Sequence, residues 1–357
     1  MLGKTGITLL FSTHVDIARF QNKIELNVNE LLNSIDKYDG YSLTRGVCGL
    51  ALLISYLQEK SRIEDDASVL LNEVDEIVLH GLKSDISIHF FDYLHGYLGI
   101  INYLIRRKHQ IINDDFILQS ILKLLTFLEE DSKYPFDYSV QDTKYVANFG
   151  LAHGIPSFLS MLININKIIK STDVDNYIRR LTLFIFSKKQ HLPHIKSKYP
   201  HCLPKEDMPY LEGRLAWCYG DLGINITLLK SARYLKDELL EKEILQDLIY
   251  CANRKSFKDT AIMDCCFCHG AAGVSYIYKQ LYRIYKINEF HENYSFWQDF
   301  IQDRYNEYGL DGLKTYYGKE GWVLEKGLLE GIAGVYISLY PDEVDQDLIN
   351  YLFLIDF

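Results

Sequence analysis

Two short stretches of the chain carry thiol and imidazole side chains that could bind a metal ion. Cys268 and His269 are adjacent, and the turn Gly270-Ala271-Ala272-Gly273 follows them directly. Thiolate and imidazole are ligands suited to zinc. A third such ligand, Cys218, lies 50 residues before Cys268. Two thiolates and one imidazole leave one tetrahedral position open, which is typical of a catalytic rather than a structural zinc site.

The cysteines also allow a redox interpretation. Cys265 and Cys268 have the Cys-x-x-Cys spacing of redox dithiols. That function is typical of a βαβ context, whereas the surrounding sequence predicts helices. The seven cysteines are an odd number, and the first 20 residues show no ordered signal-peptide pattern. We therefore prefer metal binding and expect a reducing, cytoplasmic location.

The glycines beside the candidate ligands belong to a pattern that recurs along the chain. Gly-x-x-Gly followed by an apolar stretch occurs in five places, and a sixth copy has Ser157 at the second glycine position. The six motifs lie at 46–49, 96–99, 154–157, 220–223, 270–273 and 331–334. Their first glycines are 50 to 66 residues apart. Such a spacing holds two helices of about 15 residues with their loops.

Amphipathic helices are predicted between the motif helices. Within 236–250, for example, Leu240, Ile244 and Leu248 repeat at helical spacing among charged residues. Alternating buried and amphipathic helices predict an all-α fold, with an inner ring of helices inside an outer ring. We expect residues 1–357 to form a single α/α toroid of six or seven helical hairpins. Glycines at the start of each inner helix would let the helix ends converge on one axis.

Two stretches are long for connections between helices and are interpreted as loop insertions. They are 131–148 and 190–213, and the second holds four of the seven prolines, which excludes a regular helix. Long loops in a compact ring are typically binding loops or lids. His191, His194 and His201 lie in the second stretch. Either a second metal site or solvated loop histidines would account for them.

Side chains that bind metals or transfer protons stand beside the four middle motifs. They are His95, His153, Cys218 with Tyr219, and Cys268 with His269. Because each lies at the start of an inner helix, we expect them to meet at the hub. The glycines of the first and last motifs are interpreted as packing residues without a function.

Three segments together resemble the lanthionine synthetase C-like (LanC) family, the zinc-dependent cyclases of lanthipeptide biosynthesis. The segments are Gly150-Leu151-Ala152-His153-Gly154-Ile155-Pro156, Arg214-Leu215-Ala216-Trp217-Cys218-Tyr219-Gly220 and Cys268-His269-Gly270-Ala271-Ala272-Gly273. They occur in the family's order, and the repeats extend the resemblance from about Gly40 onward. The resemblance implies that one zinc ion is held by Cys218, Cys268 and His269.

The resemblance also implies roles for four further residues. His153 matches a proton-transfer histidine, and Arg214 and Tyr219 match residues beside the first zinc cysteine. Asp92 fits an aspartate that the family has four residues before a repeat glycine. An ordinary helix-capping role for Asp92 stays open.

The implied reaction is the addition of a peptide cysteine thiol to dehydroalanine or dehydrobutyrine, which forms a (methyl)lanthionine ring. The open zinc position would hold water or the substrate thiolate. We expect His153 to donate the proton that Cα receives. Arg214 would hold Asp92 or His153, or stabilise the enolate oxygen. The hydroxyl of Tyr219 would be a further donor near the enolate.

The expected partner is a dehydrated precursor peptide, with a dehydratase and a transporter as further candidates. A net charge of −10 without a basic stripe argues against nucleic acid, and no apolar run is long enough for a membrane span. We expect a monomer in the cytoplasm, or peripheral to a membrane-associated modification complex.

Three other functions remain open at this stage. The first two are addition of glutathione or another thiol to dehydrated peptides, and a zinc-stabilised scaffold without activity. The third, a glycan-processing α/α barrel, needs paired carboxylates. Asp92, Asp221 and Glu330 are the acidic candidates for such a pair.

Overall fold

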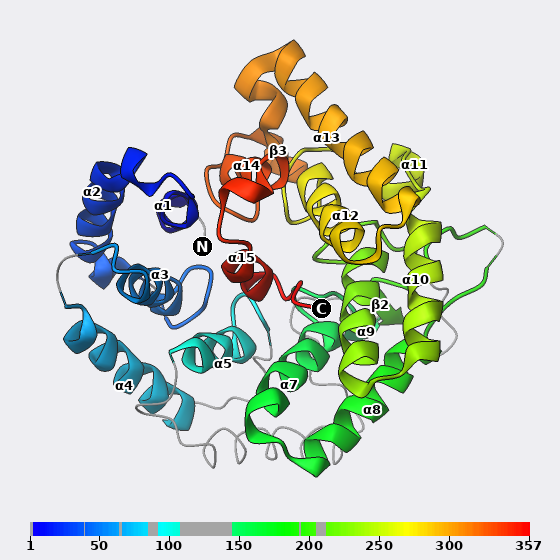
Figure 1. Cartoon of the computed structure of the whole chain (residues 1–357), viewed down its shortest axis with the longest axis horizontal. Coiled ribbons are helices and arrows are strands. Elements are labelled where there is room, and N and C mark those ends of the chain that lie inside the picture. Colours follow the sequence, from blue (N-terminus) through cyan, green and yellow to red (C-terminus); the bar gives the residue numbers. More distant parts are fainter. Residues whose placement is uncertain are drawn as a thin grey trace.

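A computed structural model of the chain describes residues 3–38, 40–63, 66–84, 92–107, 145–192, 194–204 and 212–357. Within these residues helices dominate, accompanied by two short two-stranded sheets. The expected all-α class is confirmed. The helices are arranged as a ring around a central axis (Figure 1).

An inner and an outer layer of helices make up the described part of this ring (Figure 1). The inner helices are α1 (Gly3–Thr13), α3 (Val47–Glu59), α5 (Tyr97–Arg106), α7 (Ile155–Ile169), α9 (Asp221–Leu235), α12 (Ala271–Tyr285) and α14 (Ile332–Leu339). The outer helices are α2 (Gln21–Leu32), α4 (Ser68–Ser84), α8 (Thr172–Ser187), α10 (Glu238–Ala252) and α13 (Asn288–Tyr308). Because α1 contacts both α3 and α14, the first and last inner helices close the ring.

Short elements lie between these helices. They are η1 (Ile17–Arg19), η2 (Ile35–Lys37), α11 (Phe257–Thr260), η3 (Gly309–Leu313), η4 (Gly318–Glu320) and η5 (Pro341–Glu343). None of the described helices combines the length and the apolar character that crossing a bilayer requires.

The apolar pattern of each helix decides its layer. In α7 every residue from Ile155 to Asn166 is buried, so the helix must be covered on all sides. In α8 the buried residues are Val174, Ile178, Thr182 and Ile185, which form one stripe at helical spacing. Such a helix buries one face against the inner ring and leaves the other in water.

Each Gly-x-x-Gly motif lies at the start of an inner helix, which begins at the residue after the first glycine. In four repeats the first helical N–H donates to the carbonyl seven residues earlier and closes a turn. The pairs are Val47 to Gly40, Asp221 to Arg214, Ala271 to Asp264 and Ile332 to Glu325. The second glycine packs against this turn: a Cβ on Gly273 would lie 2.0 Å from the carbonyl oxygen of Phe267. Ser157 is accommodated at the same position, where its hydroxyl donates to the carbonyl of Gly154 at 2.7 Å.

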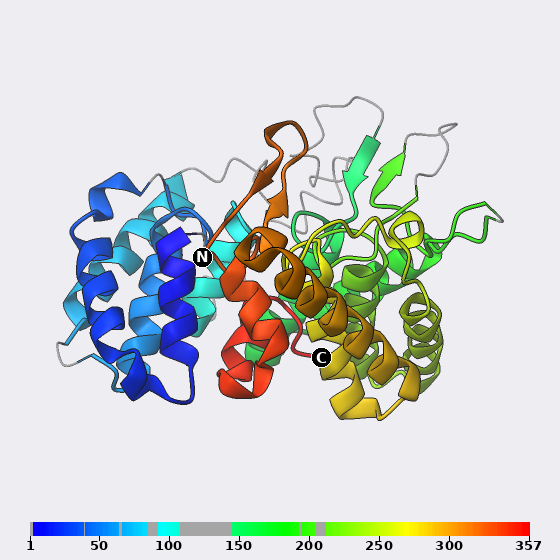
Figure 2. The ribbon, with the colours of Figure 1, turned by 90° about the horizontal axis from the view of Figure 1, so that it is seen from above.

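The two sheets lie on one face of the ring (Figure 2). Strand β1 (Tyr145–Asn148) pairs antiparallel with β2 (Cys202–Pro204), so the two insertions meet. Strand β3 (Thr315–Tyr316) pairs antiparallel with β4 (Trp322–Val323). Residues 131–144 of the first insertion, and Pro193 and 205–211 of the second, lie outside the described residues.

The C-terminal segment fills the centre of the ring near the opposite face (Figures 1 and 2). It consists of α15 (Gln346–Leu352) and the residues after it. Residues 352–355, at the end of α15 and just beyond it, are buried. The ring of Phe353 stacks on Phe267 at 4.3 Å, and its carbonyl accepts a hydrogen bond from Trp217 Nε1 at 2.7 Å. The ring is therefore packed at this level, and its other face carries the candidate site.

Candidate functional site

The three predicted metal ligands lie together where the turns before α9 and α12 meet. The ligand atoms of Cys218, Cys268 and His269 lie within 4.8 Å of one another. The N–H of Cys218 donates to the carbonyl of Cys268 at 3.2 Å, which fixes one turn to the other. Ligand atoms about 2.3 Å from a tetrahedral zinc ion are about 3.8 Å apart. Two thiols and an imidazole at these separations fit one zinc ion.

The two thiols are coupled. The hydrogen bond with Cys268, with further help from His269, holds the pKa of Cys218 well below its usual value despite burial. The same contact, together with burial, raises the pKa of Cys268 well above its usual value. A cation between the two sulfurs would favour the thiolate form of both.

A buried carboxylate lies behind His269. Asp264 is 1% exposed, and its Oδ2 lies 3.4 Å from Nε2 of His269. Burial alone would lower the pKa of His269, but hydrogen bonds with Asp264, Cys218 and Cys266 together outweigh it and raise the pKa. A histidine that binds a metal usually donates its other N–H to such a carboxylate. Asp264 is thus placed to orient the imidazole.

Asp264 also belongs to a second group of candidate ligands, with Cys266 and His269. Its carboxylate oxygens already accept the N–H groups of Cys266 at 3.1 Å and Tyr316 at 3.0 Å. Because both groups need His269, and Asp264 is bound to the backbone, Cys218 and Cys268 are the better partners for a metal. The sequence analysis did not identify Asp264, although an aspartate six residues before the motif glycine was a usable signal.

His153 is paired with Asp92. Its Nδ1 lies 2.5 Å from Oδ2 of Asp92, while Oδ1 accepts the N–H groups of Leu94 and His95, both at 2.7 Å. Asp92 therefore both caps the turn before α5 and binds the histidine. Burial would lower the pKa of His153, but the hydrogen bond and charge of Asp92 raise it overall. The pKa of Asp92 is lowered by His153 despite its own burial, so the two shifts agree.

Two rings flank His153. The centroids of His95 and Tyr219 each lie 5.7 Å from that of His153. The hydroxyl of Tyr219 accepts a hydrogen bond from Nδ2 of Asn148 at 2.8 Å, so β1 fixes its position. Burial lowers the pKa of His95, whereas the pKa of His153 is raised.

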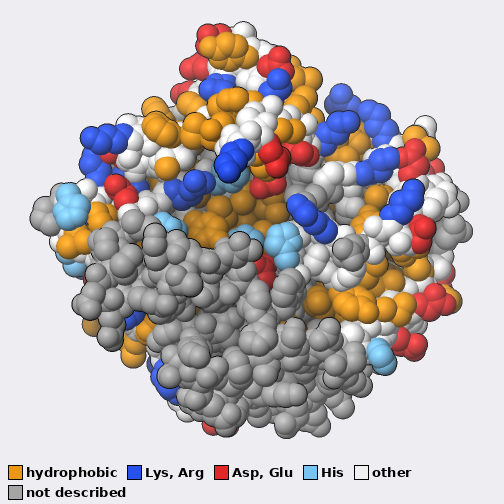
Figure 3. Space-filling model, turned by 180° about the vertical axis from the view of Figure 1, so that it is seen from behind, with side chains coloured by type: hydrophobic (Ala, Val, Ile, Leu, Met, Phe, Trp, Pro, Cys, Tyr) orange, Lys and Arg blue, Asp and Glu red, His pale blue; other side chains and the backbone are white. Residues whose placement is uncertain are grey.

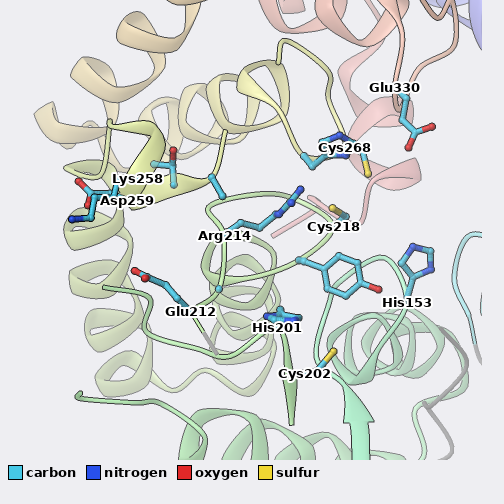
Figure 4. Close-up of a pocket in the computed structure, with 15 residues that line it drawn as sticks. His153, His201, Cys202, Glu212, Arg214, Cys218, Lys258, Asp259, Cys268 and Glu330 are labelled. Carbon is cyan, nitrogen blue, oxygen red and sulfur yellow. The ribbon is translucent and has the colours of Figure 1, made fainter. Parts of the chain in front are cut away.

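Arg214 does not bind Asp92 or His153, although one expectation was that it would hold one of them. Its side chain extends toward the sulfurs of Cys218 and Cys268 (Figure 4). Within the described ranges its guanidinium has no hydrogen bond or ion pair, and Asp92 pairs directly with His153 instead. Arg214 therefore does not hold either residue within the described ranges, and it lines the cavity beside the two cysteines.

One cavity of about 610 Å³ joins these groups (Figure 4). Its lining includes Cys218, Cys268, His269, His153, Tyr219 and Arg214, together with His201, Glu212, Lys258 and Glu330. Its volume is in the usual range of ligand pockets. On the face opposite that of Figure 1, histidine and hydrophobic side chains are visible in a central hollow with charged side chains around it (Figure 3).

Other sequence candidates lie elsewhere. His191 and His194 are exposed, and neither belongs to a candidate metal group among the described residues. Of the three histidines in that stretch, His201 alone lines the cavity. Burial raises the pKa of Cys265 to about 12, the reverse of what a redox dithiol needs. Asp221 is fully buried in an ion pair with Arg254, so it cannot act at the mouth of the ring.

Comparisons with known proteins identify the family of the chain and relate its fold to a solved structure. The family model for lanthionine synthetase C-like proteins matches residues 2–346. Among solved structures, a nisin cyclase is similar, with a TM-score of 0.74 and 20% sequence identity. The match covers 98% of this chain and 90% of the nisin cyclase chain. At this identity the structural match shows a shared helical fold.

Proposed function

Because the chain belongs to the lanthionine synthetase C-like family, we propose that it is a zinc-dependent lanthipeptide cyclase. Its substrate would be a dehydrated precursor peptide, whose cysteine thiols add to dehydroalanine or dehydrobutyrine of the same peptide. The observation that carries the proposal is the shared cavity, where Cys218, Cys268 and His269 lie near the Asp92–His153 pair.

Cys218, Cys268 and His269 would hold the zinc ion, with Asp264 orienting the histidine. Zinc bound there would lower the pKa of a substrate thiol and so supply a thiolate near neutral pH. The cavity, with a volume of about 610 Å³, leaves room for a peptide segment beside these residues.

His153 would supply the proton that Cα gains when the new C–S bond forms. Its Nδ1 is bound to Asp92, so Nε2 is the nitrogen that can reach a substrate. The raised pKa preserves the protonated imidazole to higher pH than usual, which suits a general acid. The thiol loses one proton and Cα gains one, so the product has the mass of the substrate.

The enolate that forms during the addition needs hydrogen-bond donors at its oxygen. Arg214 extends into the cavity and offers a charged donor group. Tyr219 lies on the other side of His153, and a phenol can accept from Asn148 and donate at the same time. These two residues would stabilise the negative charge.

The direct test is incubation of the zinc-loaded protein with a dehydrated peptide that contains one cysteine. We expect loss of the free thiol at unchanged peptide mass. Glutathione included in the assay separates the alternative, because its addition would raise the peptide mass. Free thiols that persist with the wild-type protein, at the same rate as with the Cys268→Ala variant, would refute the cyclase proposal.

The proposed reaction also implies partners. An enzyme that dehydrates serine and threonine must act first, so a dehydratase is a candidate partner, and a transporter would act later. We propose a monomer that works in the cytoplasm, free or at a membrane-associated complex. We further propose that residues 1–357 act as one domain, since residues from four of the repeats line the same cavity.

A further inference from the structure

In each of the six repeats, one residue directly precedes the first glycine of the Gly-x-x-Gly motif, and these six residues occupy equivalent positions. These residues are Arg45, His95, His153, Tyr219, His269 and Glu330. Three of them, His153, Tyr219 and His269, belong to the proposed site. Glu330 lines the same cavity as they do, yet no step of the proposed reaction uses it.

Glu330 is held in place from two sides. Oε2 of its half-buried carboxylate accepts a hydrogen bond from the hydroxyl of Tyr317 at 2.9 Å, next to β3. The backbone of the preceding Leu329 accepts the N–H of Cys268 at 2.8 Å. Figure 4 shows the carboxylate extending toward the part of the cavity that holds Cys268 and His153. The carboxylate is therefore fixed relative to the metal ligands.

A second cavity begins at Glu330. It has a volume of about 340 Å³, and its lining includes Arg45, Tyr317, Val323 and the glycines 327 and 331. Glu330 lines both cavities. A peptide that places its reacting residues in the metal cavity must continue beyond it, and the second cavity provides room for the next residues.

We propose that Glu330 is a substrate-binding residue of the cyclase, an inference that rests on the proposed function. Its carboxylate accepts a hydrogen bond from a main-chain N–H of the precursor peptide, where the peptide passes from the metal cavity into the second cavity. An ionised carboxylate only accepts, and its bonds to N–H groups are stronger than neutral ones. Arg214 offers donors in the same metal cavity. The two residues would therefore orient a peptide unit, with its carbonyl toward Arg214 and its N–H toward Glu330.

The test uses zinc-loaded protein and an unreactive peptide, in which alanine replaces the dehydro residue and keeps its N–H. Affinity is measured by calorimetry. We expect Glu330→Ala to weaken binding on the order of 10-fold or more, as for a lost bond to a charged group. Glu330→Gln should weaken it less, because the amide oxygen still accepts. Glu76→Gln, at an exposed position on α4 away from both cavities, is the matched control and should bind like the wild type.

The path of the peptide is tested with a longer peptide, extended at either end in turn. One extension should bind more tightly than the short peptide, and Val323→Trp, which fills the second cavity, should remove that gain. Wild-type affinity in the Glu330→Ala and Glu330→Gln variants, or a gain that survives Val323→Trp, would overturn the inference. Zinc content and circular dichroism establish that each variant is folded. If Glu330→Ala does not fold, the affinity of Glu330→Gln decides whether the inference holds. Ring formation by the wild type tests the proposed function separately.

Discussion

His153 and His269 are each paired with a buried carboxylate from the turn that precedes a repeat helix. Asp92 binds Nδ1 of His153, and Asp264 lies 3.4 Å from Nε2 of His269. In both pairs the same carboxylate also accepts backbone N–H groups of its own turn. The turn thus fixes the carboxylate, and the carboxylate fixes the imidazole. In the proposed reaction, His269 would hold the metal ion and His153 would donate a proton.

Replacing Asp92 with asparagine should change the pH dependence of ring formation. The raised pKa of His153 preserves its acid form to higher pH, so activity should fall only as pH rises through that value. Without the charge of Asp92, burial dominates and the pKa of His153 drops. The alkaline limb of kcat/KM should then move to lower pH, with a larger loss at pH 8 than at pH 6. Asp299→Asn, on the exposed side of α13, is the control and should leave the pH profile of kcat/KM unchanged. If the alkaline limb of this profile does not move in Asp92→Asn, the role of His153 is contradicted.

Zinc affinity should depend on Asp264 but not on Cys266. Loss of a carboxylate behind a ligating histidine typically weakens metal binding by about 10- to 100-fold, and we expect this for Asp264→Asn. Cys266→Ser should retain zinc, because Cys218 and Cys268 supply the two sulfurs. Competition with a chelator measures both. Loss of zinc in Cys266→Ser with retention in Cys218→Ser would show that the other group of ligands binds the metal.

At the scale of elements, the start of α9 anchors the second insertion. Asp221, the first residue of α9, is fully buried and forms an ion pair with Arg254. Its carboxylate also accepts the N–H groups of Lys198 at 3.0 Å and Tyr199 at 2.8 Å. One side chain therefore ties the stretch 190–213, which contributes to the cavity wall, to the inner ring.

Removing Arg254 should lower the stability of the folded protein, because the carboxylate of Asp221 would remain buried without its cation. We expect Arg254→Ala to lower the free energy of unfolding by about 3–5 kcal/mol, the usual cost of breaking a buried ion pair. Urea denaturation followed by circular dichroism measures it. Lys242→Ala, an exposed position on α10, should change it by less than about 0.5 kcal/mol. Equal stability of the two variants would contradict the structural role of the pair.

Most helices were predictable from local patterns. The apolar stripe within 236–250 predicts α10 (Glu238–Ala252), and the glycine motifs predict where the six inner helices begin. The seventh inner helix, α1, was not identified, because no Gly-x-x-Gly precedes it. The pairing of β1 with β2 was also missed, since strands so far apart in sequence leave no local signal of their pairing. Glu330 was named only as an acidic candidate for a glycan-processing pair, because a glutamate beside a glycine motif does not by itself indicate a peptide-binding residue.

On the scale of the whole molecule, the C-terminal segment connects the two turns that carry the proposed metal ligands. Phe353 contacts Trp217 and Phe267. These two residues directly precede Cys218 and Cys268 in the sequence. The hydroxyl of Tyr93 also donates to the carbonyl of Leu352 at 2.7 Å. Three repeats therefore pack on this one segment. That convergence arises from contacts between residues far apart in sequence, which no local pattern predicts.

Truncating Phe353 should destabilise the protein and weaken its metal site together. We expect Phe353→Ala to lower the free energy of unfolding by about 3–5 kcal/mol, as for other buried phenylalanines. Zinc affinity should fall as well, because the turns that carry Cys218 and Cys268 lose a shared support. Phe257→Ala, with 60% of that residue exposed, is the control and should change neither. Denaturation and chelator competition on the same samples measure both; unchanged zinc affinity in a destabilised Phe353→Ala would contradict the coupling.

The central claim is that Cys218, Cys268 and His269 hold one zinc ion with a position left for a substrate thiol. X-ray absorption at the zinc edge, on the zinc-loaded protein, counts the sulfur ligands. We predict one zinc ion per chain with two sulfur ligands, falling to one in Cys218→Ser and rising to three when a cysteine-containing peptide is added to the wild type. Three sulfurs before any peptide is added, or a count that the peptide leaves unchanged, would contradict the account.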